Sequence, residues 1–156
     1  MTKPSIQLFE QRPSDFNPKI EVSALYVEIE GQILLLELSS KKPECGFLGV
    51  PAGKLELGET AEDAAVRELF EETGIHVEDR SQILPLGTVF MRKPHIDYTY
   101  HLFKVLLDKF PEIILSSEHQ NYTWASPNQM NELKLMVGAR EALEKYYLYK
   151  SVKVST

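Results

Sequence analysis

The stretch over residues 53–75, GKLELGETAEDAAVRELFEETGI, constrains the fold most, because it holds a helix with both ends marked. Thr60 is a favourable N-cap residue, and Asp63 three residues later approximates a capping box. Gly74 is the residue type that most often ends a helix. We therefore predict a helix over residues 61–73.

This helix has an apolar side and an acidic side. At 100° per residue, a single apolar stripe is formed by Ala65, Val66, Leu69 and Phe70. A second group falls within about 100° on a different side and consists of Glu68, Glu71 and Glu72. We expect the stripe to pack on a sheet and the carboxylates to face a groove or solvent.

The three carboxylates repel one another, and no lysine or arginine follows any of them by four residues. Like charges at this spacing cost a helix about 0.2 to 0.5 kcal/mol each. A solvated acidic face is the ordinary interpretation of such a helix. The preceding loop, GVPAGKLELGE, favours another, because three glycines and a proline in eleven residues let backbone approach a ligand closely. Carboxylates beside such a loop are typical of a site where a divalent cation bridges protein to phosphate.

The same stretch resembles the signature of the Nudix hydrolases. That signature is Gly, five residues, Glu, seven residues, then Arg-Glu-aliphatic-any-Glu-Glu-any-Gly-aliphatic. It is met in full by Gly53, Glu59, Arg67, Glu68, Leu69, Glu71, Glu72, Gly74 and Ile75. Seven fixed residue types would match by chance about once in 10^8 placements.

The order of the other elements agrees with this resemblance. Two strands are predicted at 21–29 and 32–38, joined by a tight turn at Glu30-Gly31. More strand signals follow in QILPLGTVFM, HIDYTYHLFKVLL, EIIL and YTWAS. A helical pattern, QMNELKLMVGAREALEKYYLYK, is introduced by Ser126-Pro127. The resemblance implies an α+β fold, a Nudix-like α/β/α sandwich with a mixed β-sheet and these two helices on opposite sides. We expect a single domain over residues 1–156.

The resemblance also implies a reaction, namely metal-dependent hydrolysis of a diphosphate bond in a nucleoside diphosphate linked to another group. The implied cofactor is Mg²⁺, with Mn²⁺ as a substitute. The implied metal ligands are Glu68, Glu71, Glu72 and the carbonyl of Gly53 or Ala52. Arg67 and Glu59 would orient these carboxylates. An ordinary surface ion pair is the alternative for those two.

The general base is open at this point. Glu68 could be a metal ligand or the base that activates water. The candidate outside the signature is Glu118 in SSEHQNYTW, with Glu112 as a second choice, and either could instead be a solvated loop acid. His119 could donate to a phosphate or simply pack.

Substrate contacts are drawn from an alternating strand and from nearby cations. In HIDYTYHLF, Tyr98, Tyr100 and Leu102 share one face, and one face could stack a ring while the other packs the core. The opposite face holds Asp97, Thr99, His101 and Phe103. Arg92 and Lys93 could contact a distal phosphate or nothing at all, and Lys54 is a further candidate for a substrate contact. Trp124 could stack on a base or belong to the core. No further motif selects ADP-ribose, coenzyme A, a dinucleoside polyphosphate or an oxidised nucleotide.

Composition excludes some classes of protein. The net charge of -6 does not favour general binding of nucleic acid or anionic membranes. Cys45 is the only cysteine, so there is no internal disulfide, and no apolar run suits a signal peptide or a membrane span. We predict a cytoplasmic protein. Two alternatives stay open: a catalytically silent Nudix-like domain that binds a nucleotide or a partner, and an isoprenyl diphosphate isomerase that uses Cys45.

Overall fold

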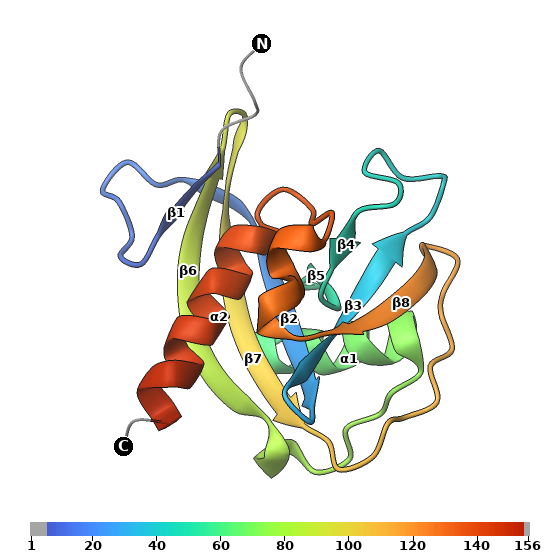
Figure 1. Ribbon diagram of the computed structural model, residues 1–156. Coiled ribbons are helices and arrows are strands. Elements are labelled where there is room, and N and C mark those ends of the chain that lie inside the picture. Colours follow the sequence, from blue (N-terminus) through green and yellow to red (C-terminus); the bar gives the residue numbers. More distant parts are fainter. Residues whose placement is uncertain (1–5, 155–156) are drawn as a thin grey trace.

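A mixed β-sheet forms the centre of the molecule, with helix α1 (Ala61–Thr73) on one face and helix α2 (Ala139–Val154) on the other (Figure 1). The structure is a computed structural model that describes residues 6–154, with side chains described up to residue 147. The two ends of the predicted domain, residues 1–5 and 155–156, lie outside the described residues. The predicted α+β fold, with two helices on opposite sides of a mixed sheet, is confirmed.

The strands run in the order β1-β6-β7-β2-β3-β4, with β5 pairing β2 and β8 pairing β3. The pair β2 and β7 is parallel and the other pairs are antiparallel. The strand bounds are β1 Gln7–Phe9, β2 Pro18–Ile29, β3 Gln32–Leu38, β4 Leu48–Gly49, β5 Ala52–Lys54, β6 Leu84–Lys93, β7 Ile96–Leu106 and β8 His119–Ala125. Two short 3₁₀ helices are η1 (Arg80–Gln82) and η2 (Pro127–Glu132).

Strand β2 organises the sheet. The predicted hairpin between β2 and β3 is confirmed, and Glu30 and Gly31 both have positive φ, 50° and 79°, as the tightest hairpin turn requires. Beyond the hairpin, β3 pairs only with the end of β2 at Glu28 and Ile29. Nearer the start of β2, the same edge pairs with β5 instead of β3. This pairing brings β5 beside α1.

The sheet has a core on each face. In β2, Leu25 and Val27 pack with α1, whereas Tyr26 packs with α2. In β7, Phe103 lies on the α1 side, and Tyr98 lies on the α2 side. The alternation seen in the sequence is thus resolved, since the tyrosine face of β7 points toward α2.

Helix α1 has the predicted bounds, because its end signals are local. Thr60 Oγ1 accepts from Asp63 N at 3.1 Å, and Gly74 closes the helix at φ 77° with its N–H bonded to Phe70 O at 2.8 Å. One part of the predicted stripe is wrong, because the Phe70 side chain is 53% exposed and meets the edge of the His76 ring. The buried arc is centred near Leu69, and Phe70 projects about 100° away from it.

The predicted C-terminal helix begins later than the sequence pattern indicated. Ser126-Pro127 does start a helix, but it is the short η2, and residues 133–138 are not helical: Leu135 forms an isolated β-bridge with Leu48, and a turn follows at residues 137–138. Leu48 N donates to Lys134 O at 2.8 Å, and Met136 N donates to Leu48 O at 2.9 Å. These bonds to a segment distant in sequence, and Gly138 at φ 91°, prevent a continuous helix.

The strand predicted at EIIL is also absent from the described sheet. It bonds to the end of α1 instead: Ile114 N donates to Thr73 O at 2.8 Å, and Ser116 N, just after the segment, donates to Glu72 O at 3.4 Å. The segment therefore satisfies helix carbonyls that would otherwise lack partners.

Candidate active site

The three signature glutamates of α1 differ in their surroundings. Glu72 is 5% exposed, whereas the Glu68 side chain is 16% and the Glu71 side chain 54% exposed. The sequence placed all three toward a groove or solvent, yet Glu72 lies within about 60° of Leu69 around the helix and is carried inward with it. Because of the helix geometry, Glu72 is buried, Glu68 is half-buried and Glu71 is exposed.

Strand β5 packs directly against the two less exposed acids. Ala52 N donates to Glu72 Oε2 at 3.2 Å. A Cβ placed on Gly53 would lie 2.1 Å from Glu68 Cδ, so only glycine leaves room for this carboxylate. Ser23 of β2 supports the arrangement, because its Oγ donates to Ala61 O at 2.7 Å at the start of α1.

Arg67 joins the acids on the outer side of the site. It donates to Glu59 through Nε at 2.7 Å and Nη2 at 2.9 Å, a two-point contact, and through Nη2 to Lys54 O at 3.0 Å. Its Nη1 donates to Glu68 Oε1 at 2.9 Å and Glu71 Oε2 at 3.2 Å. The arginine that neutralises Glu71 therefore lies four residues before it rather than after it.

The pKa values of the acids differ according to whether Arg67 contacts them or burial dominates. The hydrogen bonds from Arg67, more than any other cause, hold the pKa of Glu59 at about 2. Burial raises the pKa of Glu68 despite the contact with Arg67. For Glu72, burial and then the charge of Glu68 raise the pKa to about 9. Glu72 is thus a buried acid that the protein itself supplies with too little positive charge.

Glu118 approaches this cluster from the loop before β8. Its charge contributes to the raised pKa of both Glu68 and Glu72, and its side chain contacts Lys42 Nζ at 3.8 Å. Glu112 is exposed in the segment between β7 and β8, which hydrogen-bonds to the end of α1. His119 is half-buried, and burial lowers its pKa.

The acids are not arranged as a finished metal site. Among residues 6–147, no three His, Cys, Asp or Glu side chains converge as metal ligands would, because Glu68 and Glu71 turn toward Arg67. The donor set still fits a hard divalent cation. Within the described residues, the Glu72 side chain accepts one hydrogen bond, from a backbone N–H, and its charged neighbours are acids. The groups available as ligands are oxygens, as a hard cation prefers.

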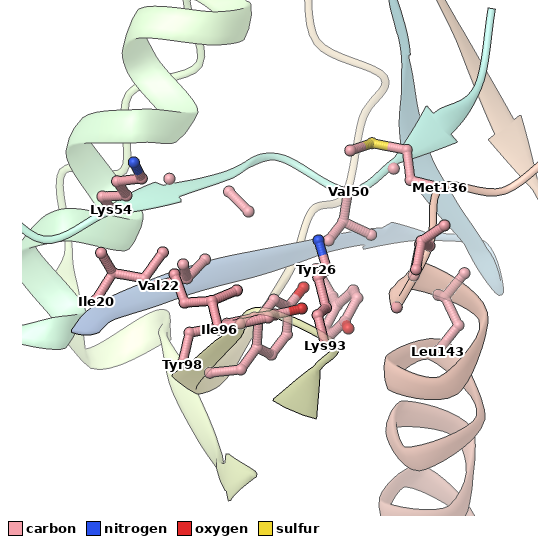
Figure 2. Close-up of a pocket in the computed structure, with 17 residues that line it drawn as sticks. Ile20, Val22, Tyr26, Val50, Lys54, Lys93, Ile96, Tyr98, Met136 and Leu143 are labelled. Carbon is pink, nitrogen blue, oxygen red and sulfur yellow. The ribbon is translucent and has the colours of Figure 1, made fainter. Parts of the chain in front are cut away.

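A cavity of about 420 Å³ lies on the other side of β5, between the α2-facing surface of the sheet and the start of α2 (Figure 2). Lys54, Tyr98 and Tyr100, all predicted substrate contacts, line it. Because Ala52 and Gly53 also line it, the cavity and the acids share β5 as a common wall.

Other candidates lie elsewhere. Arg92 is outside the cavity, because it binds Asp97 through Nε at 2.8 Å and Nη2 at 3.0 Å and also contacts Asp15. Trp124 packs edge-on against Phe110 beside the α1-side core. Cys45 is exposed in the loop between β3 and β4 and does not line the cavity, which disfavours the isomerase alternative.

Sequence reasoning missed part of the cavity wall. Met136 and Val137 belong to the non-helical segment before α2, and they were assigned to a helix. Lys93, considered with Arg92, does line the cavity, and its Nζ lies 5.5 Å from the centre of the Tyr98 ring. The sequence feature that could have predicted this break in the helix is Gly138, a glycine within an otherwise helical pattern.

The fold and the acidic cluster define a class of hydrolases that act on diphosphate bonds. A family model described as NUDIX domain matches residues 17–146, so the chain belongs to the Nudix hydrolase family. An uncharacterized Nudix hydrolase of Bacillus subtilis, YvcI, is 27% identical over 125 residues, which are 79% of this chain and 76% of that protein. The ADP-ribose pyrophosphatase of the same organism is 39% identical over 83 residues, 53% of this chain and 43% of that protein.

Solved structures agree in fold. The MutT protein from Methanosarcina mazei superposes with a TM-score of 0.72 at 23% identity, covering 87% of this chain and 96% of that one. The NUDIX domain of Shewanella oneidensis NrtR, solved with ADP ribose, superposes with a TM-score of 0.69 at 18% identity, covering 88% and 92%. In the part of this chain that the structure describes, neither helix is long and apolar enough to cross a membrane.

Proposed function

We propose that the chain hydrolyses the diphosphate bond of a nucleoside diphosphate linked to another group, with Mg²⁺ or Mn²⁺ as cofactor. The observation that carries this proposal is the buried Glu72, held against β5 among other acids with one backbone donor. Folding alone gives no reason to bury a carboxylate in that environment. Binding a metal cation at this place would explain the buried carboxylate, because the cation supplies the missing positive charge.

Glu68, Glu71, Glu72 and the Gly53 carbonyl are the groups that would hold the metal. When bound, the metal would neutralise the phosphate oxygens and stabilise the charge that develops in the displacement. The chain's own residues prepare this arrangement. Arg67 fixes the outer edge of Glu68 while its other nitrogens are held by Glu59, so the carboxylate is oriented before substrate arrives.

We assign acceptance of the water proton to Glu118. It lies on a loop opposite α1, close enough for its charge to affect Glu68 and Glu72, and its side chain is 55% exposed. An exposed loop acid can reach a water at the edge of the site, whereas Glu68 Oε1 already accepts from Arg67. Lys54 lines the cavity at β5. In the proposed complex the phosphates of the substrate would lie there, between the acids and the cavity.

The names of relatives support the nucleoside part of the proposal. Besides the ADP-ribose pyrophosphatase, they include a CTP pyrophosphohydrolase of Escherichia coli, 26% identical over 134 residues. These names share a nucleotide and differ in the rest of the molecule. The cavity beside β5 provides a place for a nucleoside in this chain.

The test is a panel of nucleoside diphosphate derivatives incubated with protein and Mg²⁺, with nucleoside monophosphate release measured by chromatography. We expect turnover of at least one compound, and its loss when EDTA removes the metal. A well-folded protein that binds a nucleotide yet releases no product from any compound would support the silent binding domain instead. Turnover that persists in EDTA would contradict the metal-dependent mechanism.

A further inference from the structure

The cavity beside β5 is lined mainly by hydrocarbon. Its apolar side chains come from β2, the β4–β5 connection, β7, the segment before α2 and α2 itself (Figure 2). They include Ile20, Val22, Val50, Ile96, Met136 and Leu143. A ligand that fills this space gains affinity by removing apolar surface from water, which does not depend on its hydrogen-bonding pattern.

The side chains of the lining offer few fixed polar groups. None of the described residues in the lining is Asp, Glu, Asn, Gln, His, Ser or Thr. Carboxylates and carboxamides are the side chains whose fixed acceptors and donors distinguish one nucleobase edge from another. The cavity therefore lacks the groups most often used to identify a base.

Backbone groups of the wall before α2 are largely engaged within the protein. Met136 N donates to Leu48 O at 2.9 Å, Val137 N to Glu44 Oε2 at 3.0 Å and Ala139 N to Met136 O at 2.9 Å. The Gly138 carbonyl accepts from Ala142 N at 3.0 Å. This wall gives the cavity its shape, and these groups are not free to bond a base.

The remaining polar side chains of the lining are phenols and lysines. A phenol rotates its hydrogen and can either donate or accept, so it adapts to keto and amino edges alike. Tyr26 and Tyr100 both line the cavity, their phenol groups interact with each other, and burial strongly raises the pKa of both. Lys54 and Lys93 offer only donors, and Lys93 lies over the Tyr98 ring.

We propose that this cavity binds the aromatic base of the substrate by shape and apolar contact and does not select base identity. The inference rests on the proposed function and specifies its substrate class: nucleoside diphosphate derivatives with interchangeable bases. Apolar pockets discriminate between similar ligands by about 10- to 200-fold, whereas sites built on hydrogen bonds reach 10⁴ to 10⁵. The spread of affinity across bases is therefore the decisive quantity.

The first experiment measures binding by calorimetry, which does not require turnover. The probes are AMP, GMP, CMP, UMP and an indole riboside monophosphate, whose ring has no base-pairing edge. We expect all five dissociation constants to fall within about 200-fold. A preference above 1,000-fold for one base, or loss of indole binding when a natural base binds, would overturn the inference. Failure of all five to bind would overturn it as well.

The second experiment separates apolar contact from hydrogen bonding. Ile96→Ala shortens a half-buried side chain of the lining and should weaken all five probes by a similar factor, whereas Ile114→Ala makes the same deletion at a 64% exposed position and should change none. Tyr98→Phe removes one hydroxyl and should leave the order of affinities unchanged. A selective loss of one base in Tyr98→Phe would show that the base is read. Base-independent binding without hydrolysis would contradict the proposed function only.

Discussion

Gly53→Ala is expected to damage the site through a single contact. The added Cβ would lie 2.1 Å from Glu68 Cδ and 2.3 Å from Glu68 Oε1, whereas ordinary contact begins near 3.4 Å. Gly53 does not have a positive φ, so alanine introduces no backbone strain there. The glutamate must therefore retreat by roughly 1 Å or more, because well-packed groups cannot overlap.

Two magnitudes follow from that displacement. Forcing extra volume into a packed site costs about 1 to 3 kcal/mol of unfolding free energy. If Glu68 works in the proposed site, a shift of about 1 Å should lower turnover by about 100-fold. Urea denaturation measures the first quantity, and initial rates on a confirmed substrate at saturating Mg²⁺ measure the second.

A double-mutant cycle tests the cause. In a Glu68→Ala background the clash is gone, so Gly53→Ala should no longer destabilise the protein and should stabilise it slightly, by about 0.4 to 1 kcal/mol, through the unfolded chain. An equal loss of stability in both backgrounds would refute the reasoning, since it would place the cost in the backbone of β5 rather than at Glu68.

Three further predictions concern individual acids. The Glu72 carboxyl has its pKa raised to about 9 in the fold, so at neutral pH it ionises in the unfolded chain but stays protonated in the metal-free folded one. Glu72→Gln removes this penalty, so the metal-free protein should be more stable in urea, while turnover should fall by about 10² or more; full activity would defeat the proposed metal ligand. Glu118→Gln should lower kcat while metal affinity, measured by calorimetry, stays nearly unchanged; a parallel loss of affinity would make Glu118 a ligand rather than the base. Arg92 holds the pKa of Asp97 at about 2, below its ordinary 3.8, so this stabilisation should persist above pH 4 and disappear as pH falls toward 2. Asp97→Asn should flatten that acid limb in thermal unfolding, and an unaltered limb would contradict the assignment.

The sequence predicts elements whose determinants are local. Helix α1 follows from Thr60 and Gly74, and the hairpin follows from Glu30-Gly31, because in each case a few neighbouring residues fix the backbone. The segment before α2 shows the limit. It has a helical pattern, but its conformation is set by bonds to Leu48, and no local feature announces a partner so distant in sequence.

The candidate site divides in the same way. Its acids were found because they share one helix with a recognisable spacing, although their grading from buried Glu72 to exposed Glu71 depends on β5 and the sheet. The cavity was only partly predicted, because Tyr98 and Met136 reach it from separate segments. Arg92 does not line the cavity, because it pairs with Asp97 across the β6–β7 hairpin, a contact that its position in the sequence did not reveal.

The ion pairs of Arg67 explain how α1 tolerates several acids and still leaves one of them available for the proposed metal. One guanidinium bonds to Glu59, Glu68 and Glu71, so three of the four signature carboxylates share a cation, and the repulsion expected along the helix is reduced at its outer side. Glu72 receives no such contact, and burial together with Glu68 raises its pKa. The acid that Arg67 does not contact thus lies at the inner end of the cluster, against β5 and next to the cavity, where a cation would favour its ionised form. A cation drawn there would meet the phosphates of a nucleotide whose base occupies the cavity, which places the proposed chemistry at β5.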